Sequence, residues 1–175
     1  MTKPQSLCES RSAARAAFAS ADPIACWEAW FDGAALPNPG KLGLGVVLQS
    51  PAGQRFEYSM KGLGTGCSNE AELQALCAAL SFAHDAGVRR LILSGDSDFA
   101  VSHGARRATT EVTRLVVLIE QVQAWVARFD VLELRWVPRH RNGDADRLSR
   151  QALGLPHKPA PHPGKPVQPR RRRSR

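Results

Sequence analysis

The order of strand-like and helix-like segments constrains the fold of this 175-residue chain more than any other feature. Three strand-like segments come first with short connections, which predicts an antiparallel meander. Helical periodicity then alternates with two further strands, and strands joined by helices pair in parallel through right-handed crossovers. The order therefore predicts an α/β domain with a mixed five-stranded sheet and helices packed on it. The predicted strands are 27–31, 42–48, 54–61, 90–94 and 131–137, and the predicted helices are 69–86, 98–104, 110–129 and about 144–154.

The first predicted helix has the clearest boundaries. Apolar residues recur through 69–86 with the 3.6-residue period of a helix packed on a sheet. Ser68 or Asn69 is the predicted N-cap, because short polar side chains accept hydrogen bonds from the first free amides. Gly87 is the predicted C-terminal stop.

The two ends of the chain differ in composition from the middle. Residues 1–25 are predicted to be a flexible arm or a short helix, and residues 155–175 a disordered tail rich in Pro and Arg. From position 157 onward there are seven basic residues and no acid, and removing them from the net charge of +8 leaves +1. A solubilising terminus, a contact with the nucleic-acid backbone and a nuclear-localisation signal all stay open for the tail. The predicted folded domain is 26–154.

Several classes of protein are disfavoured by the sequence. No apolar run approaches the roughly 20 residues of a membrane-spanning helix. The four cysteines form no CxxC pair and have no histidine at ligand spacing, which disfavours a zinc site. We expect reduced cysteines, a cytoplasmic location, no membrane contact and a monomer.

Four carboxylates stand at the ends of the predicted elements. Asp32 closes the first strand, and Asp96 closes the fourth. Ligands of open α/β sheets gather at the carboxyl ends of strands, and adjacent strands lie about 4.8 Å apart. Glu72 and Asp146 fall in the first turns of two predicted helices. All four side chains can therefore converge on one end of the sheet.

Such a cluster favours divalent cations. Two carboxylates about 4 Å apart repel by roughly 4 kcal/mol at an effective dielectric of 20, so protons or cations must neutralise them. Oxygen ligands select Mg²⁺ or Mn²⁺, and two such ions can promote hydrolysis of a phosphodiester. Each residue alone also has an ordinary explanation: Asp32 as part of a turn, and Glu72 as part of a capping box with Asn69.

Several short motifs occur together with these carboxylates and in a fixed order. With them the chain resembles the type 1 ribonuclease H family over about 27–153. The motifs are Phe31-Asp-Gly33 with Asn38-Pro-Gly40, Ser68-Asn-Glu-Ala-Glu-Leu73, Gly95-Asp-Ser97 and Val137-Pro-Arg-His-Arg-Asn-Gly-Asp-Ala-Asp-Arg-Leu148.

The resemblance implies a fold, an activity and a set of site residues. The fold is the ribonuclease H-like sheet with strand order 3-2-1-4-5, and the activity is cleavage of the RNA strand of RNA–DNA hybrids with two Mg²⁺ or Mn²⁺ ions. The family's spacing selects Glu72 over Glu70. It also makes His140 the candidate for the family's mobile histidine, although His140 can equally be a solvated loop residue. The implied metal ligands are Asp32, Glu72, Asp96 and Asp146, and the implied substrate contacts are Gly33, Asn38, Ser68 and Asn69.

One departure and two alternatives accompany this resemblance. The family's Thr-Asn-Asn run before the catalytic Glu reads Cys67-Ser68-Asn69 here, which replaces two donors with a thiol and a hydroxyl. Another nuclease of the same superfold with a different substrate preference is one alternative. A non-catalytic hybrid-binding module is the other, and the full carboxylate set argues against it because like charges repel phosphate.

Overall fold

The computed structural model describes residues 25–156, so the predictions for the N-terminal arm and for the basic tail lie outside the described residues. The strands are β1 (Trp27–Leu36), β2 (Gly40–Gln49), β3 (Arg55–Gly66), β4 (Arg90–Gly95) and β5 (Val131–Trp136). The helices are α2 (Ser68–Asp85), α3 (Asp98–Gly104), α4 (Thr113–Val126) and α5 (Gly143–Ala152), with a short 3-10 turn, η1 (Arg139–Arg141), before α5.

The five strands form one mixed sheet in the order β3-β2-β1-β4-β5. The first three are antiparallel neighbours, whereas β4 pairs in parallel with both β1 and β5. This topology confirms the predicted sheet, including its strand order and the split between antiparallel and parallel pairing.

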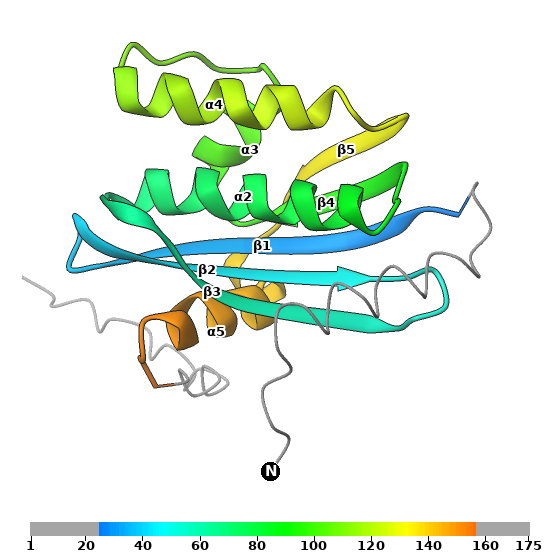
Figure 1. The fold of residues 1–175 in the computed structure, drawn as a ribbon, viewed down its shortest axis with the longest axis horizontal. Coiled ribbons are helices and arrows are strands. Elements are labelled where there is room, and N and C mark those ends of the chain that lie inside the picture. Colours follow the sequence, from blue (N-terminus) through cyan, green and yellow to red (C-terminus); the bar gives the residue numbers. More distant parts are fainter. Residues whose placement is uncertain (1–24, 157–175) are drawn as a thin grey trace, which may run out of the picture.

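Helices cover the sheet on both faces. Figure 1 shows α2 on one face of β1–β3 with α3 and α4 beyond it, and α5 on the opposite face. The apolar core lies mainly between the sheet and α2, and its large, fully buried side chains include Trp27, Phe31, Leu73, Leu76 and Leu80. In the part of the chain described here, none of the helices is both long enough and apolar enough to cross a membrane.

Strand β1 is longer than predicted. The prediction that Asp32 closes the strand is wrong, because β1 continues to Leu36 and pairs with β2 along that whole extension. Asp-Gly is a common turn signal, but here the hydrogen bonds to β2 hold the chain extended through it. Asp96 does follow the last residue of β4, as predicted.

The first turn of α2 also differs from the prediction. Its N-cap is Cys67, rather than Ser68 or Asn69. Glu70 completes a capping box, in which its Oε2 accepts a hydrogen bond from the Cys67 amide at 2.7 Å. The alternative capping box of Asn69 with Glu72 is therefore wrong, and Glu72 is free for another role. Gly87 stops the helix as predicted, with a positive φ of 85°.

Helix α5 lies very close to β2, and this proximity fixes its position. A Cβ atom on Gly45 would lie 2.2 Å from the Ala145 carbonyl oxygen, and one on Gly43 would lie 2.2 Å from the Ser149 carbonyl oxygen. Real Cβ atoms do not approach backbone this closely, so both positions require glycine. The close approach brings Asp146 and Ser149 of α5 next to Asp32 on β1.

Candidate active site

Parallel pairing of β1 with β4 brings two carboxylates to one edge of the sheet. Phe31 pairs with Gly95, so Asp32 and Asp96 follow at the same level on adjacent strands. Asp32 is 4% exposed, and its carboxylate accepts a hydrogen bond from the Ser149 hydroxyl of α5. The Trp136 indole donates to the Asp96 carbonyl oxygen at 3.1 Å, which holds the end of β4 beside β5.

Glu72 reaches the same edge from α2. A Cβ on Gly33 would lie 2.2 Å from the Ala71 carbonyl carbon, so glycine lets the helix pack directly on β1. The Gly33 amide donates to Glu72 Oε2 at 3.2 Å. This contact directs Glu72 toward Asp32, whereas Glu70 points to the start of its own helix and lies 3.5 Å from Arg114.

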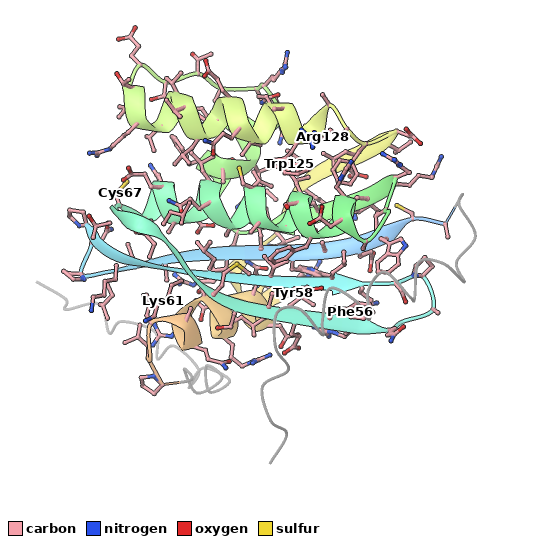
Figure 2. All side chains as sticks on the ribbon, viewed as in Figure 1. Phe56, Tyr58, Lys61, Cys67, Trp125 and Arg128 are labelled. Carbon is pink, nitrogen blue, oxygen red and sulfur yellow. The ribbon has the colours of Figure 1, made fainter. Side chains whose placement is uncertain are left out.

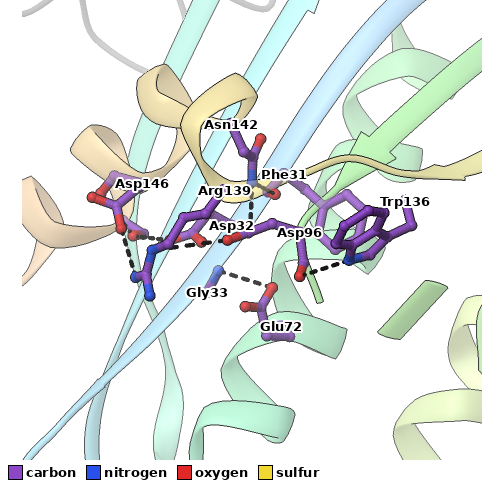
Figure 3. Close-up of polar contacts among 10 residues, drawn as sticks. Phe31, Asp32, Gly33, Glu72, Asp96, Trp136, Arg139, Asn142 and Asp146 are labelled. Atoms are coloured by element: carbon purple, nitrogen blue, oxygen red, sulfur yellow. Dashed lines mark hydrogen bonds and ion pairs between the residues drawn. The ribbon is translucent and has the colours of Figure 1, made fainter. Parts of the chain in front are cut away.

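Asp32, Glu72 and Asp96 form one cluster of oxygens (Figure 3). One carboxylate oxygen from each lies within 4.8 Å of the others. Burial, together with the charges of Asp32 and Asp96, raises the pKa of Glu72 to about 9. Burial also raises the pKa of Asp32 to about 7, although the hydrogen bond from Ser149 opposes the rise. Without a cation, the cluster retains protons near neutral pH.

Asp146 lies beside this cluster and is held by an arginine. Arg139 in η1 donates to Asp146 Oδ1 at 2.9 Å, and its Nε lies 3.9 Å from Asp96 Oδ2. Its positive charge lowers the pKa values of Asp32 and Glu72, against the larger effect of burial. The fourth carboxylate therefore faces the cluster across a guanidinium group.

Asn142 connects the segment before α5 to β1 and to the end of β4. Its side-chain amide donates to the Phe31 carbonyl oxygen at 2.9 Å and to Asp96 Oδ1 at 2.7 Å. The residue is 1% exposed, and its backbone carbonyl accepts the Asp146 amide at 3.0 Å. One buried side chain thus orients Asp96 while its backbone begins the helix that carries Asp146.

The other predicted site residues occupy varied positions. His140 is exposed in η1 and has no hydrogen bond or ion pair to a described residue, so its predicted role stays a prediction. Asn38 and Ser68 form two mutual hydrogen bonds, of 2.8 and 3.1 Å, which join the β1–β2 turn to the start of α2. Asn69 is half-buried beside them.

Three residues of this site were missed by sequence reasoning: Arg139, Asn142 and Ser149. Arg139 and Asn142 lie in and just after the short 3-10 turn η1, where no periodic pattern distinguishes a buried polar residue from a solvated one. Ser149 gave only a weak signal, since it lies one helical turn after Asp146 on the same face of α5.

The raised pKa values predict how metal-free stability depends on pH. Glu72 has a pKa of about 9 in the folded chain and 4.5 ordinarily, so the folded state binds more protons across this interval. The free energy of unfolding should therefore fall as pH rises from about 5 to 9. In EDTA at pH 9, Glu72→Gln should be more stable than wild type by about 2 kcal/mol, measured by urea unfolding. Glu120→Gln, on the exposed side of α4, is the control. An equal gain in the free energy of unfolding for Glu120→Gln would show that the effect does not come from the raised pKa of Glu72.

Comparison with known proteins identifies the family. The family model described as Reverse transcriptase-like matches residues 30–152. A ribonuclease HI of Halobacterium salinarum is 34% identical over 125 residues, which are 71% of this chain and 63% of that protein. A bifunctional protein of Mycobacterium tuberculosis is 32% identical over 123 residues, 70% of this chain and 34% of that protein. The chain thus spans about a third of one curated relative and under two thirds of the other.

Solved structures agree in fold over nearly their whole length. The ribonuclease H1 of Halobacterium salinarum superposes with a TM-score of 0.70 at 33% identity, covering 74% of this chain and 98% of that one. LC11 ribonuclease H1 in complex with an RNA/DNA hybrid gives 0.66 at 25% identity, covering 73% and 96%. The family match, these similar structures and the sheet order that the resemblance implied show that the chain belongs to the type 1 ribonuclease H family.

Proposed function

We propose that this protein is an endoribonuclease that hydrolyses the RNA strand of RNA–DNA hybrids with two divalent metal ions. The observation that carries the proposal is the cluster of Asp32, Glu72 and Asp96, whose carboxylate oxygens lie within 4.8 Å of one another. The cluster lies in a chain with the fold of the ribonuclease H family. A related structure of the same fold was solved in complex with an RNA/DNA hybrid, which supports the substrate class.

The donor set fits Mg²⁺ or Mn²⁺. Carboxylate oxygens are the ligands that these hard cations prefer, and the cluster of Asp32, Glu72 and Asp96 includes no cysteine or histidine. Asp32, Glu72 and Asp96 would hold one ion, and Asp146 would join Asp32 around a second. When bound, two such ions activate a water molecule and stabilise the leaving oxygen of a phosphodiester.

Neighbouring residues of the chain would hold the metal ligands in place and contact the substrate. Asn142 and the Gly33 amide fix Asp96 and Glu72, so both carboxylates keep their places before substrate arrives. Preorganised ligands of this kind lower the barrier because no reorientation is needed during reaction. Asn69 and the linked pair Asn38–Ser68 lie at the adjacent turn and helix start, where they would contact the substrate backbone and the 2′-hydroxyls that distinguish RNA from DNA.

Cleavage of end-labelled RNA–DNA hybrid, double-stranded RNA and double-stranded DNA tests the proposal. We expect endonucleolytic products from the RNA strand of the hybrid with Mg²⁺ or Mn²⁺, and none with EDTA. Preferential cleavage of double-stranded RNA or DNA would instead indicate another nuclease of the same superfold. Hybrid binding without cleavage of any substrate would indicate a binding module.

Arg139 should compete with a divalent cation for the carboxylates. Its guanidinium lies 2.9 Å from Asp146 and adds positive charge beside Asp96. Arg139→Ala should therefore tighten Mg²⁺ binding roughly fivefold, about 1 kcal/mol for one partly solvated ion pair. Titration calorimetry without nucleic acid measures this directly. His140→Ala, at the adjacent exposed position, is the control and should bind Mg²⁺ like wild type. Unchanged or weaker binding by Arg139→Ala would show that the guanidinium does not compete.

A further inference from the structure

A hollow lies at the end of α5 that is remote from the carboxylates. Its volume is about 620 Å³, and it is lined by the start of β2, the second half of β3 and the end of α5. Leu42, Ala152 and Leu153 give it apolar walls, and Lys41 and Lys61 are its charged residues. None of the described residues that line it is acidic.

The positive charge of this hollow is not neutralised within the described part of the chain. Lys41 and Lys61 are exposed, and neither has an ion pair with a described residue. They are also the only lysines between positions 25 and 156. Two arginines near α5 differ in this respect: Arg55 pairs with Asp144 and Arg147 pairs with Glu57, both at 2.5 Å. An anion in the hollow would therefore meet the positive charges of Lys41 and Lys61, which no described acidic residue neutralises.

The sheet register connects this hollow to the carboxylate cluster. Asp32 pairs with Gly45, and Lys61 pairs with Gly43, which lies two residues before Gly45 on β2. Both glycines face α5, which begins near the carboxylates and ends at the hollow. Lys41 is four residues from Gly45, or about 13 Å along the strand, and follows the turn that contains Asn38. Figure 2 shows Lys61 at the same end of the sheet as Cys67, the N-cap of α2.

We propose that the Lys41–Lys61 hollow binds the sugar–phosphate backbone of the nucleic acid whose RNA strand lies at the carboxylates. A nucleic-acid strand carries one charge per roughly 3.4 Å of helix rise, so a strand at Asp32 has phosphates within reach of this hollow. The two ammonium groups would contact phosphates and release counterions, and the apolar walls would cover the sugars. The ligand class rests on the proposed function, but the charge and the location of the hollow do not.

The salt dependence of hybrid binding tests this contact. In EDTA, the Lys41→Ala/Lys61→Ala double variant should bind hybrid roughly tenfold more weakly at low salt. Its slope of log Kobs against log[salt] should be shallower by about 1.8, since each phosphate contact contributes about 0.9. Lys41→Arg/Lys61→Arg should retain wild-type binding. Arg128→Ala removes an exposed cation that stacks 4.3 Å from Trp125 beyond α2, and it should leave the slope unchanged. An unchanged slope in the double alanine variant would overturn the proposal.

Lysine footprinting of the wild-type protein tests the same contact without relying on variants, which can fold poorly. With hybrid bound in EDTA, acylation of Lys41 and Lys61 should fall severalfold, as measured by peptide mass spectrometry. Metal-dependent cleavage of hybrid without protection of either lysine would contradict the proposed backbone contact at the hollow and leave the proposed function standing. Protection of both lysines without cleavage of any substrate would contradict the hydrolytic function and support the backbone contact at the hollow.

Discussion

Replacement of Asp32 by Asn should lower kcat/KM for hybrid cleavage by about 10³-fold, or about 4 kcal/mol of transition-state stabilisation. Asp32 is 4% exposed and lies between Glu72, Asp96 and the hydroxyl of Ser149. An amide keeps the shape of the side chain but removes a negative oxygen from both proposed ion positions. The measurement is steady-state cleavage of a labelled hybrid at saturating Mg²⁺.

A nearby carboxylate supplies the matched control. Asp144 lies on the same helix as Asp146, but its carboxylate faces outward and pairs with Arg55 at 2.5 Å. Asp144→Asn should therefore retain activity within about twofold, since exposed ion pairs contribute roughly 0–1 kcal/mol. Metal-free Asp32→Asn should be folded, and above pH 7 more stable than wild type, because a buried carboxylate with a pKa of about 7 has been neutralised. Full activity in this folded variant would refute the metal-site assignment.

Much of the fold followed from patterns that the sequence displays directly. The meander and the parallel crossovers were predicted because apolar periodicity and short connections restrict how these segments can pair, whereas the strand order came from the resemblance to the type 1 ribonuclease H family. Boundaries were predicted less well where a tertiary contact overrides local preference. Ser68 is a better N-cap than Cys67 by propensity. In the folded chain, however, Ser68 pairs with Asn38, and Cys67 occupies the N-cap with Glu70 as its partner.

The candidate site was predictable only in part, for a similar reason. The choice of Glu72 over Glu70 came from family spacing, and the structure supplies the physical difference: Glu70 caps its own helix, whereas Glu72 accepts the Gly33 amide. Arg139 and Asn142 lie within the last of the family's motifs, at 137–148, but nothing in the sequence singled either of them out. Their importance arises from the pairing of β1 with β4, which brings Phe31 and Asp96 within reach of one loop.

Asn142→Asp should cause the largest loss of stability among single substitutions around the site, about 3 kcal/mol at pH 8. The new side chain has nearly the same shape, but an ionised carboxylate cannot donate a hydrogen bond. It would face two acceptors, the Phe31 carbonyl oxygen at 2.9 Å and Asp96 Oδ1 at 2.7 Å, in a position that is 1% exposed. Urea unfolding of the metal-free protein measures the loss.

The pH dependence of this loss separates a donor role from simple packing. A protonated carboxyl group can donate once, so the deficit of Asn142→Asp relative to wild type should shrink as pH falls toward 5. Asn69→Asp adds the same charge at the start of α2, where the helix dipole favours it, and should not destabilise the protein. Asn142→Asp should also lose about 10²-fold in hybrid cleavage, because Asp96 is then repelled from its ligand position. A deficit that is equal at pH 5 and pH 8 would mean that the ionised carboxylate is not its cause, and would contradict the proposal that the two hydrogen bonds donated by Asn142 orient Asp96.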